Sequence, residues 1–130
     1  MLTYTLLIMS APYNTHNVES ALNFVKFLMK NKKNSIQNIF FYGNGVLNAN
    51  KMILNEKKEK TLSYQWYKLS KKFSINLNVC STSAQERGII SKSMNKNFEL
   101  LYENVHDGFN ITGLGCLIKS ILNSDRILQF

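Results

Sequence analysis

The chain has 130 residues, 45% of them hydrophobic and 12% aromatic, with one Pro and six Gly. This composition excludes a disordered or fibrous protein and a long flexible linker, and it fits a single domain over residues 1–130. The net charge of +8 comes from 14 Lys and 2 Arg against 8 acidic residues. Because recognition of phosphates and bases favours Arg, this charge alone does not predict a nucleic-acid surface. No apolar run approaches the roughly 20 residues of a membrane span, and no signal peptide is visible, so we expect a cytoplasmic protein without membrane association.

The first half of the sequence alternates between predicted strands and helices. An apolar run over residues 4–9 predicts a buried strand, and the turn residues of 10–15 end it. Apolar residues recur at helical spacing over 18–29, and residues 36–42 predict a second strand. Residues 43–60 predict a long loop, with or without a short helix in it.

The second half continues this alternation. Further strands are expected at residues 75–79, 109–112 and 126–130. The third strand alternates apolar residues with Asn76 and Asn78. Further helices are expected over 62–73 and from Ser81, directly after Cys80, to near Gly88. One or two helical turns are expected around Met94, Phe98 and Leu101. The last helix is expected along an apolar face formed by Leu114, Leu117, Ile118, Ile121 and Leu122.

This order of elements predicts an α/β three-layer sandwich, with a central, mostly parallel sheet of about five strands and helices on both faces. Right-handed crossovers place the carboxyl ends of the first three strands at one edge of the sheet. In such folds the functional site lies outside the carboxyl ends of the strands. We therefore expect segments 10–15, 43–50 and 80–87 to meet there.

Cys80 is the strongest candidate for chemistry, because it stands at the end of a predicted strand and directly before a predicted helix. The unpaired N–H groups at a helix start stabilise a thiolate, which is the nucleophilic form of cysteine. Arg87 would add positive charge if the short helix folds back, whereas a Glu86 carboxylate pointing at the thiol would disfavour the thiolate. The alternative interpretation is a buried, small apolar residue, a common role of free cysteine.

The other chemically capable residues have simpler interpretations. Cys116 precedes the apolar stripe of the last helix and is expected to pack, and its spacing from Cys80 indicates neither a dithiol relay nor a zinc site. His16 is expected at the surface or at a helix cap, and His106 in a turn. No nucleotide-binding glycine pattern, catalytic motif or metal-ligand spacing is present, so we expect no cofactor and no metal.

Aromatic residues gather near the predicted sheet edge. Tyr13 follows the first strand, and Phe40, Phe41 and Tyr42 end the second. These side chains fit three roles, namely the wall of an apolar pocket around Cys80, ordinary packing at strand ends, or part of a subunit interface. The sequence leaves all three open.

A set of short segments runs along the whole chain in a specific order. The first half contributes Ala11-Pro12-Tyr13 with Thr15, Phe40-Phe41-Tyr42, Gly45-Val46 and Asn48-Ala49-Asn50. The second half contributes Leu77-Asn78 before Cys80, Arg87-Gly88, Gly108-Phe109, Gly113-Leu114-Gly115, Asp125-Arg126 and Gln129-Phe130. By their order and spacing, these segments resemble the DsrE-like family, and within it the TusD-like subunits of bacterial TusBCD sulfur-relay complexes.

The resemblance implies a DsrE-like fold, a heterohexamer with TusB-like and TusC-like subunits, and a sulfurtransferase that carries sulfur as a persulfide on Cys80. Sulfur would arrive from a TusA-like donor and leave to a TusE-like acceptor, for 2-thiolation of the wobble uridine of tRNA. Cys116 matches no catalytic position of the family. Contacts with substrate or partner proteins are expected at Tyr13, Phe41, Tyr42, Gly45 and Arg87.

Other functions stay open at this point. A DsrE-type carrier of sulfur oxidation would use the same chemistry with different partners. A structural subunit of the same kind of complex would hold Cys80 as an inert residue. Direct binding of tRNA through the Lys-rich surface is not expected, and it would show a steep dependence on salt.

Overall fold

The computed structural model describes residues 2–100 and 102–130. Its centre is a five-stranded sheet with the strand order β4-β3-β2-β1-β5, in which every neighbouring pair is parallel. The strands are β1 (Thr3–Ile8), β2 (Ser35–Phe41), β3 (Leu77–Cys80), β4 (Phe109–Thr112) and β5 (Arg126–Gln129). The predicted α/β class with a mostly parallel sheet is confirmed.

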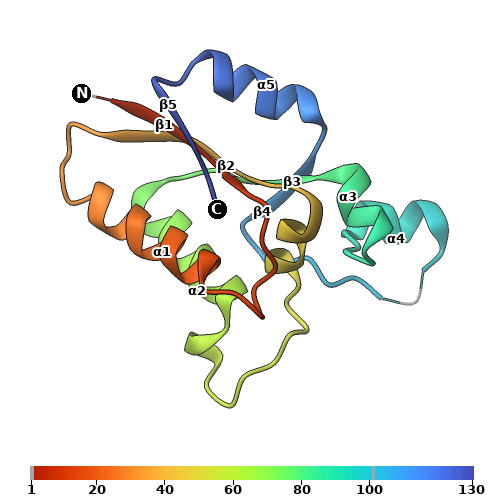
Figure 1. Cartoon of the computed structure of the whole chain (residues 1–130). Helices are drawn as coiled ribbons and strands as arrows, with labels where there is room; N and C mark the ends of the chain where they lie inside the picture. The colour runs from red at the N-terminus through yellow and green to blue at the C-terminus, as the bar shows by residue number, and fades with distance from the viewer. Residues whose placement is uncertain (1, 101) are drawn as a thin grey trace.

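Helices cover both faces of the sheet, as Figure 1 shows. Helices α1 and α2 lie on one face and α5 lies on the other, while α3 and α4 lie beside the sheet beyond the end of β3. The helices are α1 (Asn17–Leu28), α2 (Leu62–Phe73), α3 (Ser81–Glu86), α4 (Lys92–Phe98) and α5 (Leu114–Leu122), with the 3-10 helices η1 (Gly43–Ala49) and η2 (Lys58–Lys60). No helix in the described part of the chain is long and apolar enough to span a bilayer.

The main apolar core lies between the sheet and helices α1 and α2. Alternate side chains of a strand lie on opposite faces, and on this face Leu6, Ile39 and Phe41 are fully buried. Phe41 packs edge-on against Trp66 of α2, with ring centroids 5.3 Å apart and planes at 85°. Apolar residues that recur at helical spacing on α1 and α2 complete the core, so the predicted stripes of these two helices are the faces they bury.

The opposite face of the sheet, under α5, is polar at its centre. Asn38 of β2 donates from Nδ2 to Ser120 Oγ of α5 at 2.9 Å. Asn78 of β3 donates from Nδ2 to Asn38 Oδ1 at 2.7 Å. Thr5 Oγ1 of β1 lies 2.6 Å from Ser124 Oγ, just beyond the end of α5. These five residues form a hydrogen-bonded layer, which we call the polar layer.

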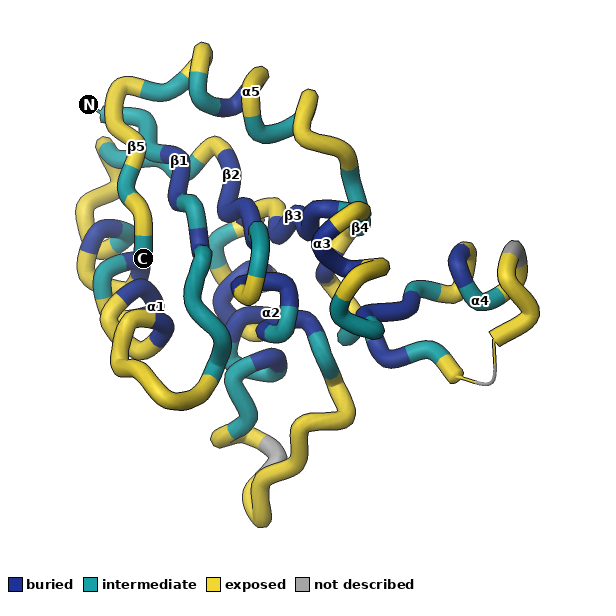
Figure 2. Tube along the Cα trace, turned by 45° about the vertical axis from the view of Figure 1, so that its right-hand side comes forward, coloured by how far each residue is buried: buried dark blue, intermediate teal, exposed yellow. Residues whose placement is uncertain are grey.

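The apolar stripe predicted for α5 forms, but the chain does not bury it. Ser120 is the residue of α5 that is buried, because its hydroxyl joins the polar layer. Leu114, Ile118 and Leu122 consequently face outward and are 45%, 57% and 79% exposed. Figure 2 shows this helix largely exposed, whereas β2 and β3 are mostly buried.

Element boundaries differ from the sequence prediction in places. Helix α2 ends at its C-cap Ser74, which adopts a left-handed conformation (φ 54°), and strand β3 runs from Leu77 to Cys80 rather than over 75–79. The predicted loop 43–60 contains η1 in its first part. Helix α4 accounts for the predicted turns around Met94, whereas Leu101 lies outside the described residues.

Gly45 allows η1 to pass against the end of β1, and this contact generates a prediction. A Cβ on Gly45 would lie 1.9 Å from the carbonyl oxygen of Ile8. We expect Gly45→Ala to lower the free energy of unfolding by about 3 kcal/mol, because the backbone must shift to relieve the overlap. Gly115→Ala is the matched control, since a Cβ there meets nothing within 4 Å. Urea unfolding of both variants tests this, and equal stabilities would contradict it.

Candidate functional site

Three segments that are distant in the sequence meet at the carboxyl edge of the sheet, as predicted. Segment 10–15 follows β1, segment 43–50 contains η1, and segment 80–87 contains α3. Asn48 of η1 joins the first two segments, because its Nδ2 donates to the carbonyl oxygen of Ser10 at 3.0 Å. Ser83 of α3 and Arg87 at its end join segments 43–50 and 80–87. The edge is therefore a single hydrogen-bonded structure.

Asn48 has a wider role than this one bond. Its side chain is buried, and Nδ2 also donates to the carbonyl oxygen of Gly45 at 2.8 Å. Its Oδ1 accepts a hydrogen bond from Trp66 Nε1 of α2 at 3.3 Å. The Asn48 amide therefore satisfies two backbone carbonyls and the only polar atom of the buried Trp66 side chain. These bonds fix η1 against both the sheet edge and α2.

Cys80 lies where the sequence predicts, at the end of a strand and the start of a helix. It is the last residue of β3, and α3 begins with Ser81. Its side chain is 2% exposed and belongs to the core, and it makes no capping hydrogen bond to α3. The β3–β4 register places it directly beside Thr112. The thiol is therefore held beneath the surface of the edge.

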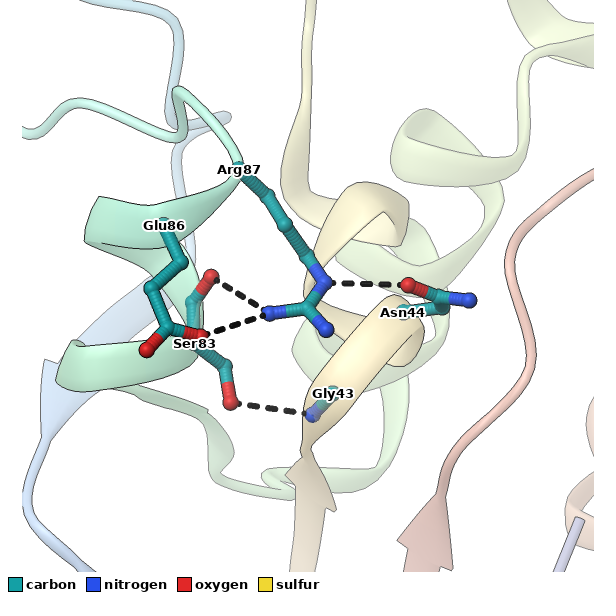
Figure 3. Close-up of polar contacts among 5 residues, drawn as sticks. All are labelled: Gly43, Asn44, Ser83, Glu86 and Arg87. Atoms are coloured by element: carbon teal, nitrogen blue, oxygen red, sulfur yellow. Dashed lines mark hydrogen bonds and ion pairs between the residues drawn. The ribbon is translucent and has the colours of Figure 1, made fainter.

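Arg87 and Ser83 connect α3 to η1, as Figure 3 shows. Arg87 Nε donates to Asn44 Oδ1 at 3.0 Å, and its Nη1 donates to the carbonyl oxygen of Ser83 at 3.3 Å. The Gly43 N–H donates to Ser83 Oγ at 3.1 Å. Because the guanidinium presents its donors in a rigid fork, it bridges both elements at once. We call these four residues the α3 latch.

Glu86 faces Arg87 and not the thiol. Its Oε2 lies 3.3 Å from Arg87 Nη1, and its side chain is 65% exposed. Cys80 is at the other end of α3, roughly 9 Å away along the helix axis at 1.5 Å per residue. An ion pair this exposed contributes at most about 1 kcal/mol. In this geometry Glu86 therefore neutralises part of the Arg87 charge without contacting Cys80.

The remaining predicted site residues divide between the edge and the core. Tyr13 is 49% exposed in the turn after β1. Tyr42 is half-buried directly after β2, and Gly45 provides the close approach to β1. Phe41 is fully buried against Trp66. The structure thus keeps Tyr13, Tyr42 and Gly45 at the edge with Cys80, and it places Phe41 inside the core.

Asn104 belongs to this region and was not singled out from the sequence. It is 4% exposed, and its Oδ1 accepts from the Ile90 N–H at 2.6 Å. Its Nδ2 donates to the carbonyl oxygen of Gly88 at 3.0 Å and to Asn50 Oδ1 at 3.2 Å. These bonds attach the segment after α3 to the end of η1. No local pattern distinguishes Asn104 among the 17 Asn of the chain.

Cys116 and the two histidines take ordinary structural positions. Cys116 is half-buried on α5, where its sulfur accepts a hydrogen bond from Asn38 Nδ2 at 3.7 Å. His16 is exposed at the start of α1. The ring centroid of His106 lies 5.1 Å from that of Tyr67. Among residues 2–100 and 102–130, no three His, Cys, Asp or Glu side chains gather in a group that could hold a metal.

The surface also has open hollows that do not include Cys80. Three of about 480, 480 and 600 Å³ are lined mainly by residues of α2 and the loop that precedes it, together with α1 in the first and third, Pro12 in the first, and His106 and Asp107 in the second. Cys80 lines none of these three.

Comparison with known proteins finds relatives over the whole chain. Residues 3–130 match the DsrE/DsrF-like family. The chain is 36% identical over 129 residues to the sulfurtransferase TusD of Proteus mirabilis (strain HI4320), covering 99% of this chain and 98% of that protein. It is 38% identical over 129 residues to the sulfurtransferase TusD of Buchnera aphidicola subsp. Acyrthosiphon pisum (strain 5A), covering 99% and 100%.

A solved structure has the same fold. The ychN protein from E. coli superposes with a TM-score of 0.76 over 100% of both chains, at 15% sequence identity. This likeness concerns the fold alone. The relatives of similar length confirm the resemblance found in the sequence and the predicted enzyme class, sulfurtransferase. The chain belongs to the DsrE/DsrF-like family.

Proposed function

We propose that this chain is a sulfur carrier that accepts sulfur on Cys80 as a persulfide and passes it to a partner protein. The position of Cys80 carries the proposal, because it ends β3 and precedes α3 in a chain related over its full length to TusD sulfurtransferases. In α/β sheets the carboxyl ends of the strands hold the functional site. In this proposal residues 1–130 act as one DsrE-like domain.

The transfer requires only thiol exchange. The Cys80 thiolate attacks the outer sulfur of the donor's persulfide, so that a new S–S bond forms on Cys80 while the donor's S–S bond breaks. The donor thiolate leaves with the bonding electron pair. An acceptor thiolate then attacks the outer sulfur on Cys80, and the Cys80 thiolate leaves in the same way. Each step forms one S–S bond and breaks one, so it consumes no oxidant, reductant or cofactor.

The proposed partners follow from the relatives. We propose a TusA-like donor, a TusE-like acceptor and TusB-like and TusC-like subunits, acting in the cytoplasm in 2-thiolation of the wobble uridine of tRNA. Full-length similarity to TusD proteins supports this assignment. A DsrE-type carrier of sulfur oxidation would perform the same exchange with other proteins. The identity of the proteins that exchange sulfur with the chain distinguishes the two.

The burial of Cys80 sets a condition on this function. At 2% exposure the thiol cannot meet a donor's persulfide unless a covering segment moves. The α3 latch holds the helix that directly follows Cys80, so its opening is the movement we propose. The same burial favours a second candidate function, that of a structural subunit with an inert Cys80. The experiments below separate the two.

The outer surface of α5 supports the proposed assembly with related subunits. Leu114, Ile118 and Leu122 form an exposed apolar stripe, and Ile127 of β5 is also 44% exposed. Ile127 is paired with Thr5 of the polar layer, so it lies on the face of the sheet that α5 covers. Exposed apolar side chains that gather along one face of a helix, as on α5, mark protein interfaces. We propose that a related subunit covers this stripe.

Sulfur loading tests the carrier role directly. Wild type, Cys80→Ser and Cys116→Ser chains are each assembled with the related subunits, mixed with a persulfidated donor and weighed by intact-protein mass spectrometry. Wild type and Cys116→Ser should gain one sulfur atom, and Cys80→Ser should gain none, because Cys116 packs between α5 and Asn38 of the sheet. If wild type gains no sulfur from a donor shown to be competent, the chain is a structural subunit.

Thiol labelling tests the α3 latch. On a Cys116→Ser background, Arg87→Ala removes the donors to Asn44 and Ser83, so α3 is held less firmly. We expect the rate of maleimide labelling of Cys80 to rise about tenfold, the effect of roughly one lost hydrogen bond on an opening equilibrium. The matched control is Arg126→Ala, because that exposed arginine donates to the Asp125 carbonyl, outside the latch. Equal labelling rates in the two variants would argue against the latch.

A charge on the α5 stripe tests the assembly. Ile118→Glu places a carboxylate in the exposed stripe, whereas Lys119→Glu places one beside it on the same helix. After co-expression with the related subunits, we expect light scattering to find Lys119→Glu in the complex and Ile118→Glu as a free chain, because burying an unpaired charge opposes association. Normal assembly of Ile118→Glu would show that this stripe is not the interface.

A further inference from the structure

One buried side-chain polar atom of the described residues lacks a hydrogen-bond partner, and it belongs to the residue paired with Cys80. The hydroxyl oxygen of Thr112 is inaccessible to solvent and is not hydrogen-bonded. Thr112 is the last residue of β4, and the parallel register pairs it with Cys80, the last residue of β3. Buried hydroxyls are nearly always paired in folded proteins, so an orphan next to a candidate nucleophile requires an explanation.

The two side chains lie on the same face of the sheet. Asn78 is on the face covered by α5, because it donates to Asn38, which donates to Ser120. Side chains two residues apart on a strand share a face, so Cys80 lies on that face as well. Thr112 is the register partner of Cys80, and paired positions in neighbouring strands share a face about 4.8 Å apart. The side chains of Thr112 and Cys80 are therefore neighbours on this face, and no hydrogen bond joins the hydroxyl to the sulfur.

The chemistry of the loaded cysteine supplies the missing partner. A thiol is a weak hydrogen-bond acceptor, which fits a hydroxyl left unpaired in the sulfur-free chain. A persulfide adds a second sulfur about 2.05 Å beyond the first, and its ionised form carries a negative charge that accepts hydrogen bonds strongly. Because Thr112 is paired with Cys80 on the adjacent strand, its hydroxyl is the candidate donor to this second sulfur.

We propose that Thr112 binds the transferred sulfur, by donating its hydroxyl hydrogen to the outer sulfur of the Cys80 persulfide. This inference rests on the proposed function, because it requires that Cys80 carries sulfur. Hydrogen bonding to the charged form stabilises the loaded state relative to the empty one. In this proposal the Thr112 hydroxyl is hydrogen-bonded only while Cys80 carries the transferred sulfur.

The equilibrium of sulfur exchange tests this role. The assembled complex containing wild type, Thr112→Val or Thr112→Ser is mixed with the same persulfidated donor, and the loaded fraction of Cys80 is measured at equilibrium by intact mass. Valine keeps the shape and removes the hydroxyl, whereas serine retains it. We expect the exchange constant to fall about tenfold in Thr112→Val, the effect of losing a hydrogen bond to a charged group, and to stay near wild type in Thr112→Ser.

Two further measurements separate this role from a structural one. Thr112→Val should unfold at or above the wild-type urea concentration, because the empty chain loses no hydrogen bond and no longer buries an unpaired hydroxyl. The maleimide labelling rate of its empty Cys80 should also match wild type. Should Thr112→Val fail to fold, Thr112→Ala supplies the hydroxyl-free measurement.

The outcomes distinguish this inference from the proposed function. A wild-type chain that gains no sulfur overturns both. A wild-type chain that loads normally, together with an equal exchange constant in Thr112→Val, overturns the role of Thr112 and leaves the carrier function in place. A loss of loading in Thr112→Ser as large as that in Thr112→Val also overturns it, because serine retains the donor.

Discussion

Buried amide side chains hold the carboxyl edge together, and Asn48 and Asn104 each make three hydrogen bonds there. Segments that leave a sheet lose their ladder partners, so each buried backbone group there needs another hydrogen bond. Asn48 satisfies the carbonyls of Ser10 and Gly45, and Asn104 satisfies backbone groups of Gly88 and Ile90. Loss of either amide would leave several buried groups unpaired at once. The surroundings of Cys80 are therefore stabilised as a unit.

The fold was largely predictable, because burial leaves plain patterns in the sequence. The apolar runs at 4–9 and 36–42 predict β1 and β2, and the stripe containing Trp66 predicts α2. The exposure of the α5 stripe could not be predicted in this way. It depends on the bond between Ser120 and Asn38, residues 82 positions apart in the sequence, and helical spacing reports only which side chains share a face.

The candidate site was predictable in position but not in its details. Strand order and crossover handedness place Cys80 at the carboxyl edge, and the structure agrees. Its burial and its pairing with Thr112 depend on how β3 and β4 align, which no local pattern records. The 17 Asn suggest general compositional drift, yet Asn48 and Asn104 are buried and tie the edge together. Residue type alone does not show which of the 17 asparagines have a structural role.

The bond between Asn38 and Asn78 also encodes the alignment of the sheet. It joins β2 to β3 on the face that α5 covers. A slip of one residue in either strand would turn an amide into the apolar side of the sheet and turn a core residue such as Phe41 out of it. Misaligned states thus lose hydrogen bonds and apolar burial together, which widens their energy gap from the native state. Two leucines at these positions would penalise such a slip less, because no amide would then enter the apolar core. The amide pair therefore favours the alignment that places β3, and Cys80 at its end, at the carboxyl edge.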